Sequence, residues 1–218
     1  MRSRSLPLAV LALAAWLTPT PLSAAGSTAE EGMTPEEKAE EAFHRAVRYR
    51  DEAAELEAEA ATLEGAAAEK KLEKAAKAHE RAARSLRAAI GHDPSMHQAH
   101  SDLGFALRKL GDYEGALASY DRALELSPGY PEAIEYRAEA YLGLGRLEDA
   151  KAAYMELLRT DRPSADELMT AMKRWVEQRR ADAQRLDAAT VEDFALWVEE
   201  RERAAAQTAD LGAVASGW

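Results

Sequence analysis

The residue types best suited to metal binding gather in one short stretch of this 218-residue chain. His92, His97 and His100 lie close together, and His97 and His100 share one face of a predicted helix. Imidazole groups bind zinc and copper, so a metal site at His92–His100 is one hypothesis. Asp93-Pro94, however, has the pattern of a stop between helices, and His97 lies at a helix start. We therefore favour a structural role for these histidines and expect no metal or other cofactor.

No arrangement of catalytic residues is recognisable elsewhere in the sequence. The chain has no glycine-rich phosphate loop, no Gly-x-Ser-x-Gly elbow and no His-Glu-x-x-His pair. Carboxylate pairs are numerous, but polar helices of this composition carry them without any acid–base role. Cysteine is absent, which excludes disulfides, thiol catalysis and a lipid anchor on a cysteine. We therefore expect a protein that is not an enzyme.

Composition and charge favour a helical protein that binds other proteins. Alanine, leucine, glutamate and arginine dominate, while the 12 glycines and 8 prolines lie mostly between periodic segments. That usage is typical of long helices and predicts an all-α fold. Acidic residues outnumber basic ones by 39 to 28, for a net charge of −11. Such a surface repels phosphate backbones, so we expect no nucleic-acid partner.

The N-terminal residues have the pattern of a signal peptide, which we assign to residues 1–25. Arg2 and Arg4 precede the apolar run Leu6–Leu17, and Ser23-Ala24-Ala25 forms a small-residue cleavage pattern. A helix of that apolar run would rise only about 18 Å, short of the roughly 30 Å hydrocarbon core. We therefore expect a periplasmic or secreted protein with no stable membrane span after cleavage. An uncleaved N-terminal anchor is the alternative.

Residues 34–94 follow a short leader, residues 26–33, and predict two long helices. Thr34 and Glu37 have the spacing of a capping box around Pro35. Apolar residues then recur in steps of three and four up to Leu63, and a second such seam runs from Ala68 to Ala89. The step of five between these seams contains Gly65. It predicts a turn between antiparallel helices, although a continuous coiled coil is an alternative. The same alanine-rich seams would also allow two chains to pair as a homodimer.

Residues 97–163 contain two copies of one helical pair. Gly111 and Gly145 mark the turns inside the copies, while Pro128-Gly129 and Pro163 are predicted to end them. At an offset of 34 residues, the matching positions are Leu107 and Tyr141, Gly111 and Gly145, Ala116 and Ala150, Tyr120 and Tyr154, and Leu124 and Leu158.

A 34-residue period of paired helices with this pattern resembles the tetratricopeptide repeat. The resemblance implies a right-handed solenoid with units at 97–130 and 131–163. Residues 34–94 then form a degenerate repeat, residues 164–210 form capping helices and residues 211–218 form a tail. We expect the first capping helix to be capped by Ser164, and a second helix to begin at Thr190. The large residues of the pairs are predicted to be core, namely Leu103, Leu107, Tyr120, Leu124, Tyr141, Tyr154 and Leu158.

The resemblance also implies that the first helix of each pair lines a concave groove. The residues turned away from the predicted core on these helices are Gln98, Ser101, Phe105, Arg108, Glu132, Glu135, Glu139 and Leu142, with Asp166, Met169 and Lys173 on the capping helix. Phe105 is either an anchor for a bound segment or a packing residue covered by the long hairpin. Trp175 matches Tyr141 in register, which favours packing at the end of the stack over a ligand platform.

The three glutamates of this set predict a groove that is acidic along one wall. Such a wall favours a basic or neutral protein segment, whereas a solvated face without a partner is the alternative. Members of the family that grip a terminal carboxylate use basic and amide side chains here, so that mode is not expected. The sequence thus predicts a non-enzymatic protein-interaction scaffold in the bacterial cell envelope. The alternatives are a homodimer through the hairpin and a metal-binding protein.

Overall fold

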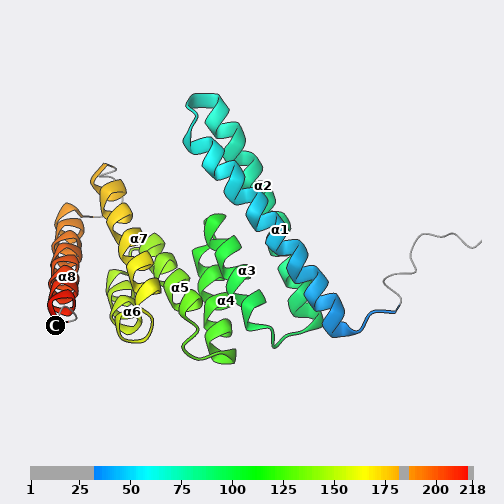
Figure 1. Cartoon of the computed structure of the whole chain (residues 1–218). Coiled ribbons are helices and arrows are strands. Elements are labelled where there is room, and N and C mark those ends of the chain that lie inside the picture. Colours follow the sequence, from blue (N-terminus) through cyan, green and yellow to red (C-terminus); the bar gives the residue numbers. More distant parts are fainter. Residues whose placement is uncertain (1–31, 182–186, 216–218) are drawn as a thin grey trace, which may run out of the picture. The chain divides into compact units, whose positions relative to one another are not determined.

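The computed structural model describes residues 32–181 and 187–215 and contains eight α-helices and no strand within them (Figure 1). The predicted signal peptide, residues 1–25, and residues 26–31 of the predicted leader lie outside this range. The helices are α1 (Pro35–Ala61), α2 (Gly65–His92), α3 (His97–Lys109), α4 (Tyr113–Leu126), α5 (Pro131–Leu144), α6 (Leu147–Thr160), α7 (Arg162–Ala181) and α8 (Ala188–Ala215). The prediction of an all-α fold is confirmed.

Helices α1 and α2 form a long antiparallel hairpin, so the alternative of one continuous rod is wrong. The predicted capping box is present: the Thr34 hydroxyl accepts from the Glu37 amide at 3.2 Å, and the Glu37 carboxylate accepts from the Thr34 amide at 2.7 Å. Gly65 begins α2 with a φ of +58°, which favours glycine. The residues of α1 that are buried in this hairpin are all alanines, namely Ala39, Ala42, Ala46, Ala53 and Ala60.

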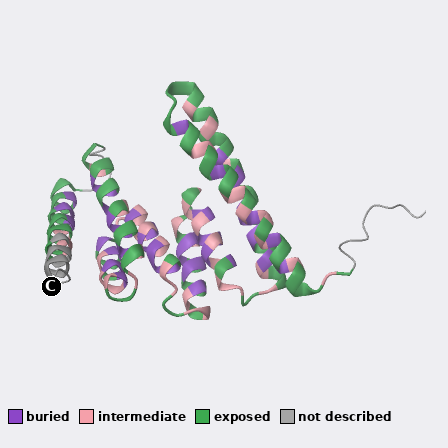
Figure 2. Ribbon diagram, in the orientation of Figure 1, coloured by how far each residue is buried: buried purple, intermediate pink, exposed green. Residues whose placement is uncertain are grey.

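The large apolar residues of the predicted hairpin seam are exposed near the turn. Leu63 and Leu72 are 40% and 51% exposed, because no third helix covers that end of the hairpin. A small cluster of Ala53, Ala75 and Ala78, with Leu56 beside it, forms the turn-side core, and Ala60 is also buried near the turn. The longer helices of this first pair therefore extend past the repeats with a thin apolar interior (Figure 2).

Two shorter helical pairs, α3 with α4 and α5 with α6, follow the hairpin. Gly111 and Gly145 adopt φ values of +82° and +72° at the predicted turns. Asp112 caps α4, since its carboxylate accepts from the Gly115 amide at 3.0 Å. Within the first pair, Gly104 lies against the ring of Tyr120, and a Cβ at position 104 would approach it to 2.5 Å. A glycine is therefore needed for these two helices to pack this closely.

The predicted boundaries of the last two helices are wrong by a few residues. Helix α7 begins at Arg162, and the Asp161 carboxylate accepts from the Ser164 amide at 2.9 Å. Asp161 is thus the cap where Ser164 was expected, and Pro163 lies in the first turn of α7 instead of ending the preceding repeat, a position where proline is well tolerated. Helix α8 begins at Ala188, two residues before Thr190, and continues to Ala215.

The apolar interior forms two main clusters, which meet at α5. One joins the hairpin to α3, α4 and part of α5, and the other joins α5 to α8. Leu103, Leu107, Tyr120 and Tyr154 are buried as predicted. The remaining predicted core residues, Leu124, Tyr141 and Leu158, are half-buried and pack against the clusters. In the described part of the chain, no helix is long and apolar enough to cross a membrane.

Candidate functional site

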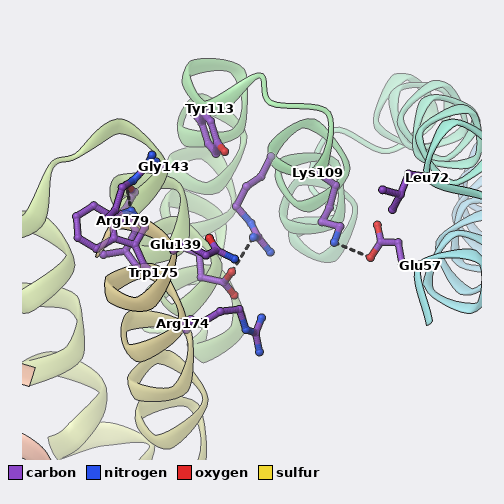
Figure 3. A pocket seen from close by; sticks show the side chains of 13 residues that line it. Glu57, Leu72, Lys109, Tyr113, Glu139, Gly143, Arg174, Trp175 and Arg179 are labelled. Atoms are coloured by element: carbon purple, nitrogen blue, oxygen red, sulfur yellow. Dashed lines mark hydrogen bonds and ion pairs between the residues drawn. The ribbon is translucent and has the colours of Figure 1, made fainter. Parts of the chain in front are cut away.

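A cavity of about 460 Å³ opens where the hairpin faces the ends of the shorter helices (Figure 3). Helices α3, α5 and α7 contact one another in sequence, which places their side chains along one face. Arg108 and Lys109 reach the cavity from the last turn of α3, and Glu139 reaches it from α5. Arg174 and Arg179 come from α7, and Glu57 and Leu72 come from the hairpin. The cavity is therefore built from four successive parts of the fold.

One side of the cavity depends on a glycine in α5. A Cβ at Gly143 would overlap the ring of Tyr113, which begins α4 and also lines the cavity. The indole nitrogen of Trp175 donates to the carbonyl of Leu142 at 2.7 Å, and this buried bond ties α7 to the end of α5. Trp175 also packs edge-on against Phe194 with ring centroids 5.4 Å apart. The walls are thus held by packing and by a backbone contact.

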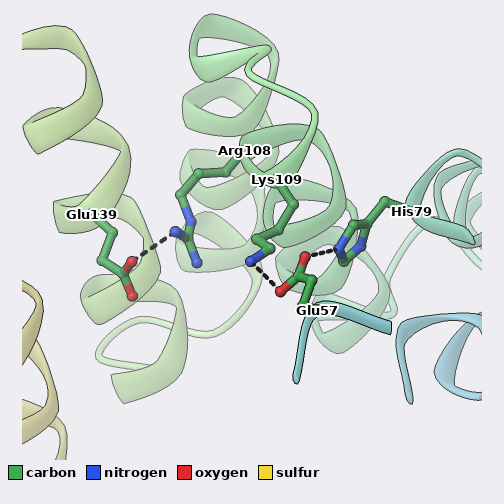
Figure 4. A network of polar contacts seen from close by, with 5 residues as sticks. All are labelled: Glu57, His79, Arg108, Lys109 and Glu139. Atoms are coloured by element: carbon green, nitrogen blue, oxygen red, sulfur yellow. Dashed lines mark hydrogen bonds and ion pairs between the residues drawn. The ribbon is translucent and has the colours of Figure 1, made fainter. Parts of the chain in front are cut away.

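A polar network crosses from α5 through α3 to the hairpin (Figure 4). Arg108 donates to Glu139 at 2.7 Å, and Lys109 donates to Glu57 at 2.6 Å. The other oxygen of Glu57 is 2.9 Å from Nε2 of His79 in α2. The side chain of His79 is 3% exposed, so this hydrogen bond is largely shielded from water. The network therefore links three successive helical pairs through adjacent residues of α3.

The environment of the network shifts the pKa values of its members. Burial disfavours the charged form of Glu57, but hydrogen bonds from Lys109 and His79 outweigh it, and the pKa of Glu57 lies below its ordinary value. Burial lowers the pKa of His79, although Glu57 opposes this shift. Glu57 is therefore ionised at neutral pH, whereas His79 is neutral and donates from Nε2.

A second titratable group, Glu135, lies on α5 one turn before Glu139. Burial, with the nearby charges of Glu139 and Glu167, raises the pKa of Glu135 to about 7, although Arg108 opposes this. The guanidinium of Arg108 itself lies 5.2 Å from the ring centroid of Phe105 and is mostly buried. Glu135 is thus only partly ionised near neutral pH and contributes little negative charge to this face.

The predicted groove residues divide into three groups. Arg108, Glu139 and Leu142 line the cavity, and Gln98 and Glu132 lie exposed at the other end of their helices. The others are covered: Ser101 and Glu135 are 1% and 9% exposed, and Phe105 lies between the rings of His79, at 6.0 Å, and Tyr136, at 5.3 Å.

Phe105 therefore packs against the hairpin, which is the second of the two alternatives considered for it.

The predicted face of α7 is also rotated away from the cavity. Lys173 donates to Glu202 of α8 at 2.6 Å, Asp166 pairs with Arg162, and Met169 is buried. The cavity instead receives Ala171, Arg174, Trp175, Gln178 and Arg179. Periodicity identifies the faces of α7, but it does not indicate which face meets α5, because α8 packs on the other side. Glu57 and Leu72 were missed as site residues because no repeat pattern extends into the turn-side half of the hairpin. Lys109 was missed because it lies one residue after Arg108, outside the predicted face of α3.

The alternative roles for the histidines and the alanine seams find no support in the geometry. His97 packs edge-on against Tyr130 with centroids 4.9 Å apart, and His100 lies 3.1 Å from the carbonyl of Pro94. No group of three metal-ligating side chains is placed to hold an ion within residues 32–181 and 187–215. Alanines of both seams, including Ala42, Ala53, Ala75 and Ala82, pack within one chain, and pairing of two chains through the hairpin stays a prediction.

Two sequence profiles of the tetratricopeptide repeat match the chain, at residues 73–131 and 107–174. The chain is a tetratricopeptide repeat protein. The first match includes α2, and the second reaches α7, so the repeats extend on both sides of the two well-formed pairs. Repeats of this family are typically non-enzymatic scaffolds, and the chain is a protein-interaction module.

Two curated relatives match part of this chain. Protein FlbA of Caulobacter vibrioides is 37% identical over 67 residues, covering 31% of this chain and 11% of that protein. The TPR repeat-containing thioredoxin TTL4 of Arabidopsis thaliana is 43% identical over 58 residues, covering 27% of this chain and 8% of that protein. This tetratricopeptide repeat protein therefore spans only about a tenth of the length of either relative.

Proposed function

We propose that this protein is a non-enzymatic scaffold of the bacterial cell envelope that binds a segment of a partner protein in its concave face. The cavity between α3, α5, α7 and the hairpin carries this proposal. At about 460 Å³, it has room for two or three side chains of a bound segment. Its lining combines apolar surface at Leu72 and Tyr113 with charged groups at fixed positions, which is the composition of a recognition site and not of a packed interior.

The charge of the partner needs revision from the sequence-based expectation. A basic or neutral segment was expected because Glu132, Glu135 and Glu139 share one face of α5. In the fold Glu135 is buried with a raised pKa, and Glu139 is bound by Arg108. The acidic wall is therefore reduced to Glu132 at the far end of the face. A basic partner has no clear counter-charge in the cavity itself.

Photo-crosslinking tests whether a partner segment occupies the cavity. A benzophenone side chain at Gln178, which lines the cavity, should yield a discrete crosslinked species in the cells that make this protein. The same group at Ala118, which is exposed on α4 outside the cavity, is the matched control. Filling the cavity with Ala171→Trp should remove the species. Equal crosslinking from positions 178 and 118, or persistence in the Ala171→Trp variant, would exclude binding at this site.

Export is tested separately from binding. A C-terminal alkaline phosphatase fusion should be active with residues 1–25 present and inactive without them, because that enzyme needs an oxidising compartment to form its disulfides. Mass measurement of the exported chain should show an N-terminus at Gly26. Activity of the fusion that lacks residues 1–25, or retention of these residues on the purified chain, would contradict the proposed signal peptide.

A further inference from the structure

The cavity carries more positive than negative charge, although the protein as a whole is acidic. Its ionisable lining consists of four bases, Arg108, Lys109, Arg174 and Arg179, and two acids, Glu57 and Glu139. Both acids are already bonded to lining bases, Glu139 to Arg108 at 2.7 Å and Glu57 to Lys109 at 2.6 Å. These two pairs are neutral together. The charge presented to a ligand is therefore that of the two arginines of α7.

Neither of these arginines has a carboxylate partner in the described part of the fold. Arg174 is exposed and makes no hydrogen bond or ion pair there. The guanidinium of Arg179 lies 5.5 Å from the ring centroid of Trp175, and its Nε is buried with no acceptor. Most other arginines of the repeats and caps have found an acidic neighbour, as Arg180 has in Glu192. Arg159 and Arg201 also lack an acidic neighbour among the described residues, but of these unpaired arginines only Arg174 and Arg179 line the cavity.

The position of Arg179 is fixed before any ligand binds. Its guanidinium stacks over Trp175, and Trp175 is held by its hydrogen bond to the Leu142 carbonyl. A stacked guanidinium loses little conformational freedom when it donates to a carboxylate, and its planar N–H groups match the two carboxylate oxygens. Since none of the Arg179 N–H groups has an acceptor among the described residues, a carboxylate would satisfy donors that the fold leaves without a partner.

The opposite wall of the cavity comes from the hairpin and carries one apolar side chain, Leu72, beside Glu57. Leu72 is 51% exposed, although it is one of the largest apolar side chains of α2. It faces the cavity on the part of the hairpin that extends past the repeats (Figure 3). An exposed leucine across the cavity from unpaired arginines favours a ligand that carries both acidic groups and an apolar side chain.

From these contacts we infer that the cavity binds an acidic peptide segment. Carboxylate side chains of the segment bind Arg174 and Arg179, and an apolar side chain packs on Leu72. The net charge of −11 does not prevent this, because charges are screened over about 8 Å at physiological ionic strength and the lining charges are closest. This inference rests on the proposed function and specifies the chemistry of the partner. It replaces the basic or neutral segment expected from the sequence.

Fluorescence anisotropy with three labelled peptides tests the inference. Each peptide has about ten residues, alternates leucine with glutamate, serine or lysine, and is capped at both ends so that no terminal charge contributes. We expect the glutamate peptide to bind the purified chain at micromolar concentration, and the other two to bind at least about tenfold more weakly. Binding of the glutamate peptide should weaken with added salt.

Matched variants locate the binding to the cavity. Arg174→Gln with Arg179→Gln should weaken binding of the glutamate peptide by at least about tenfold. Arg87→Gln with Arg159→Gln removes the same charge from exposed positions outside the cavity and should change affinity by less than about twofold. Melting followed by circular dichroism checks folding. If the double cavity variant does not fold, Arg174→Gln alone serves, because Arg174 is exposed and unpaired.

The remaining outcomes overturn the inference in distinguishable ways. If the serine or lysine peptide binds as tightly and Ala171→Trp removes that binding, the cavity binds a segment of other chemistry and the proposed function stands. If the cavity variant and the control variant lose the same affinity for the glutamate peptide, the peptide is attracted by the overall charge and not bound at the cavity. If no peptide binds at about 100 μM, the inference is wrong, and crosslinking at Gln178 alone decides the proposed function.

Discussion

The N-terminal hairpin and the repeats that follow it bury different kinds of side chain. The buried residues of α1 are all alanines, whereas the repeats bury Tyr120, Tyr154 and Leu157. Alanine removes one methyl group from water, while a tyrosine buries a ring several times larger. The two helices of the hairpin thus approach closely but gain little from the hydrophobic effect at each position.

The hairpin is attached to the repeats by polar contacts as well as by packing. Arg50 of α1 donates to Asp102 of α3 at 3.1 Å, and Lys109 of α3 donates to Glu57 of α1 at 2.6 Å. We expect the repeats to be the more stable part of the site, and together with α7 they supply its cations. The hairpin is a less stable wall whose position depends on charge. This difference indicates where substitutions should damage the fold and where they should affect mainly the site.

The largest expected effect is the loss of an aromatic residue from the repeats. Tyr120→Ala should lower the free energy of unfolding by about 3–5 kcal/mol, because the ring is fully buried against Gly104. In the hairpin, the substitution to compare with it is Ala82→Gly. Helix propensity predicts that this change lowers the free energy of unfolding by about 1 kcal/mol. Urea unfolding followed by circular dichroism measures both. Equal losses would show that the hairpin is as important to stability as the repeats.

Replacing a buried alanine with leucine should also destabilise the repeats more than the hairpin. Ala116→Leu places three extra carbon atoms at a closed contact between helices and should cost about 1–3 kcal/mol. Ala53→Leu adds the same volume between α1 and α2 in the turn-side half of the hairpin. Ala53 is fully buried there, but no third described helix packs on that half to stop the two helices from separating, so the cost should be less than about 1 kcal/mol. Thermal melting of the two variants tests this. A larger loss for Ala53→Leu would show that the hairpin seam is tightly constrained.

The pH dependence of stability should have opposite signs in the two regions. In the repeats, the folded-state pKa of Glu135, about 7, lies above its ordinary value of 4.5, so its contribution to stability is present below pH 4.5 and is lost as pH rises towards 7. Glu135→Gln should therefore be more stable than wild type by about 1–2 kcal/mol near pH 8, with no such advantage near pH 4. Urea unfolding across this range measures the difference.

In the hairpin, the pKa of His79 is lowered, so its contribution is lost as pH falls below its ordinary value of 6.5. His79→Gln should therefore weaken acid destabilisation in the same titration. A pH profile unchanged by Glu135→Gln would show that Glu135 is ionised freely in the fold.

The smallest expected effect is on the polar link between the hairpin and α3. Glu57→Gln removes the charge that binds Lys109 and should cost about 0.5–1 kcal/mol, because the carboxylate is 31% exposed and solvent screens part of the attraction. Glu55→Gln changes an exposed, unpaired glutamate of the same helix and should be neutral within about 0.5 kcal/mol. A double-mutant cycle with Lys109→Met isolates the pair. A coupling energy near zero would mean that packing alone places the hairpin.

Much of the fold follows from local rules in the sequence. The capping box at Thr34, the glycine turns at Gly111 and Gly145, and the 34-residue overlay all depend on residues near one another in the chain. The errors occurred where two local signals compete. Asp161 and Ser164 are both good helix caps, and Pro163 is acceptable either after one helix or within the first turn of the next. The packing of α7 on α5 and α6 selects the earlier start.

The site was less predictable than the fold, and the reason is physical. Periodicity shows that Glu135 and Glu139 share a face, but it does not show that Arg108 reaches Glu139 from another helix or that Glu135 is covered. Periodicity also does not predict how α7 is rotated about its own axis. Because of that rotation, Arg174 and Arg179 face the cavity and Lys173 faces α8.

The sequence by itself determined the helices, their pairing and the family, because spacing within the chain sets all three. The charge of the concave face was decided only by the tertiary structure, since that charge is a sum over side chains from four helical pairs and depends on which of them neutralise one another.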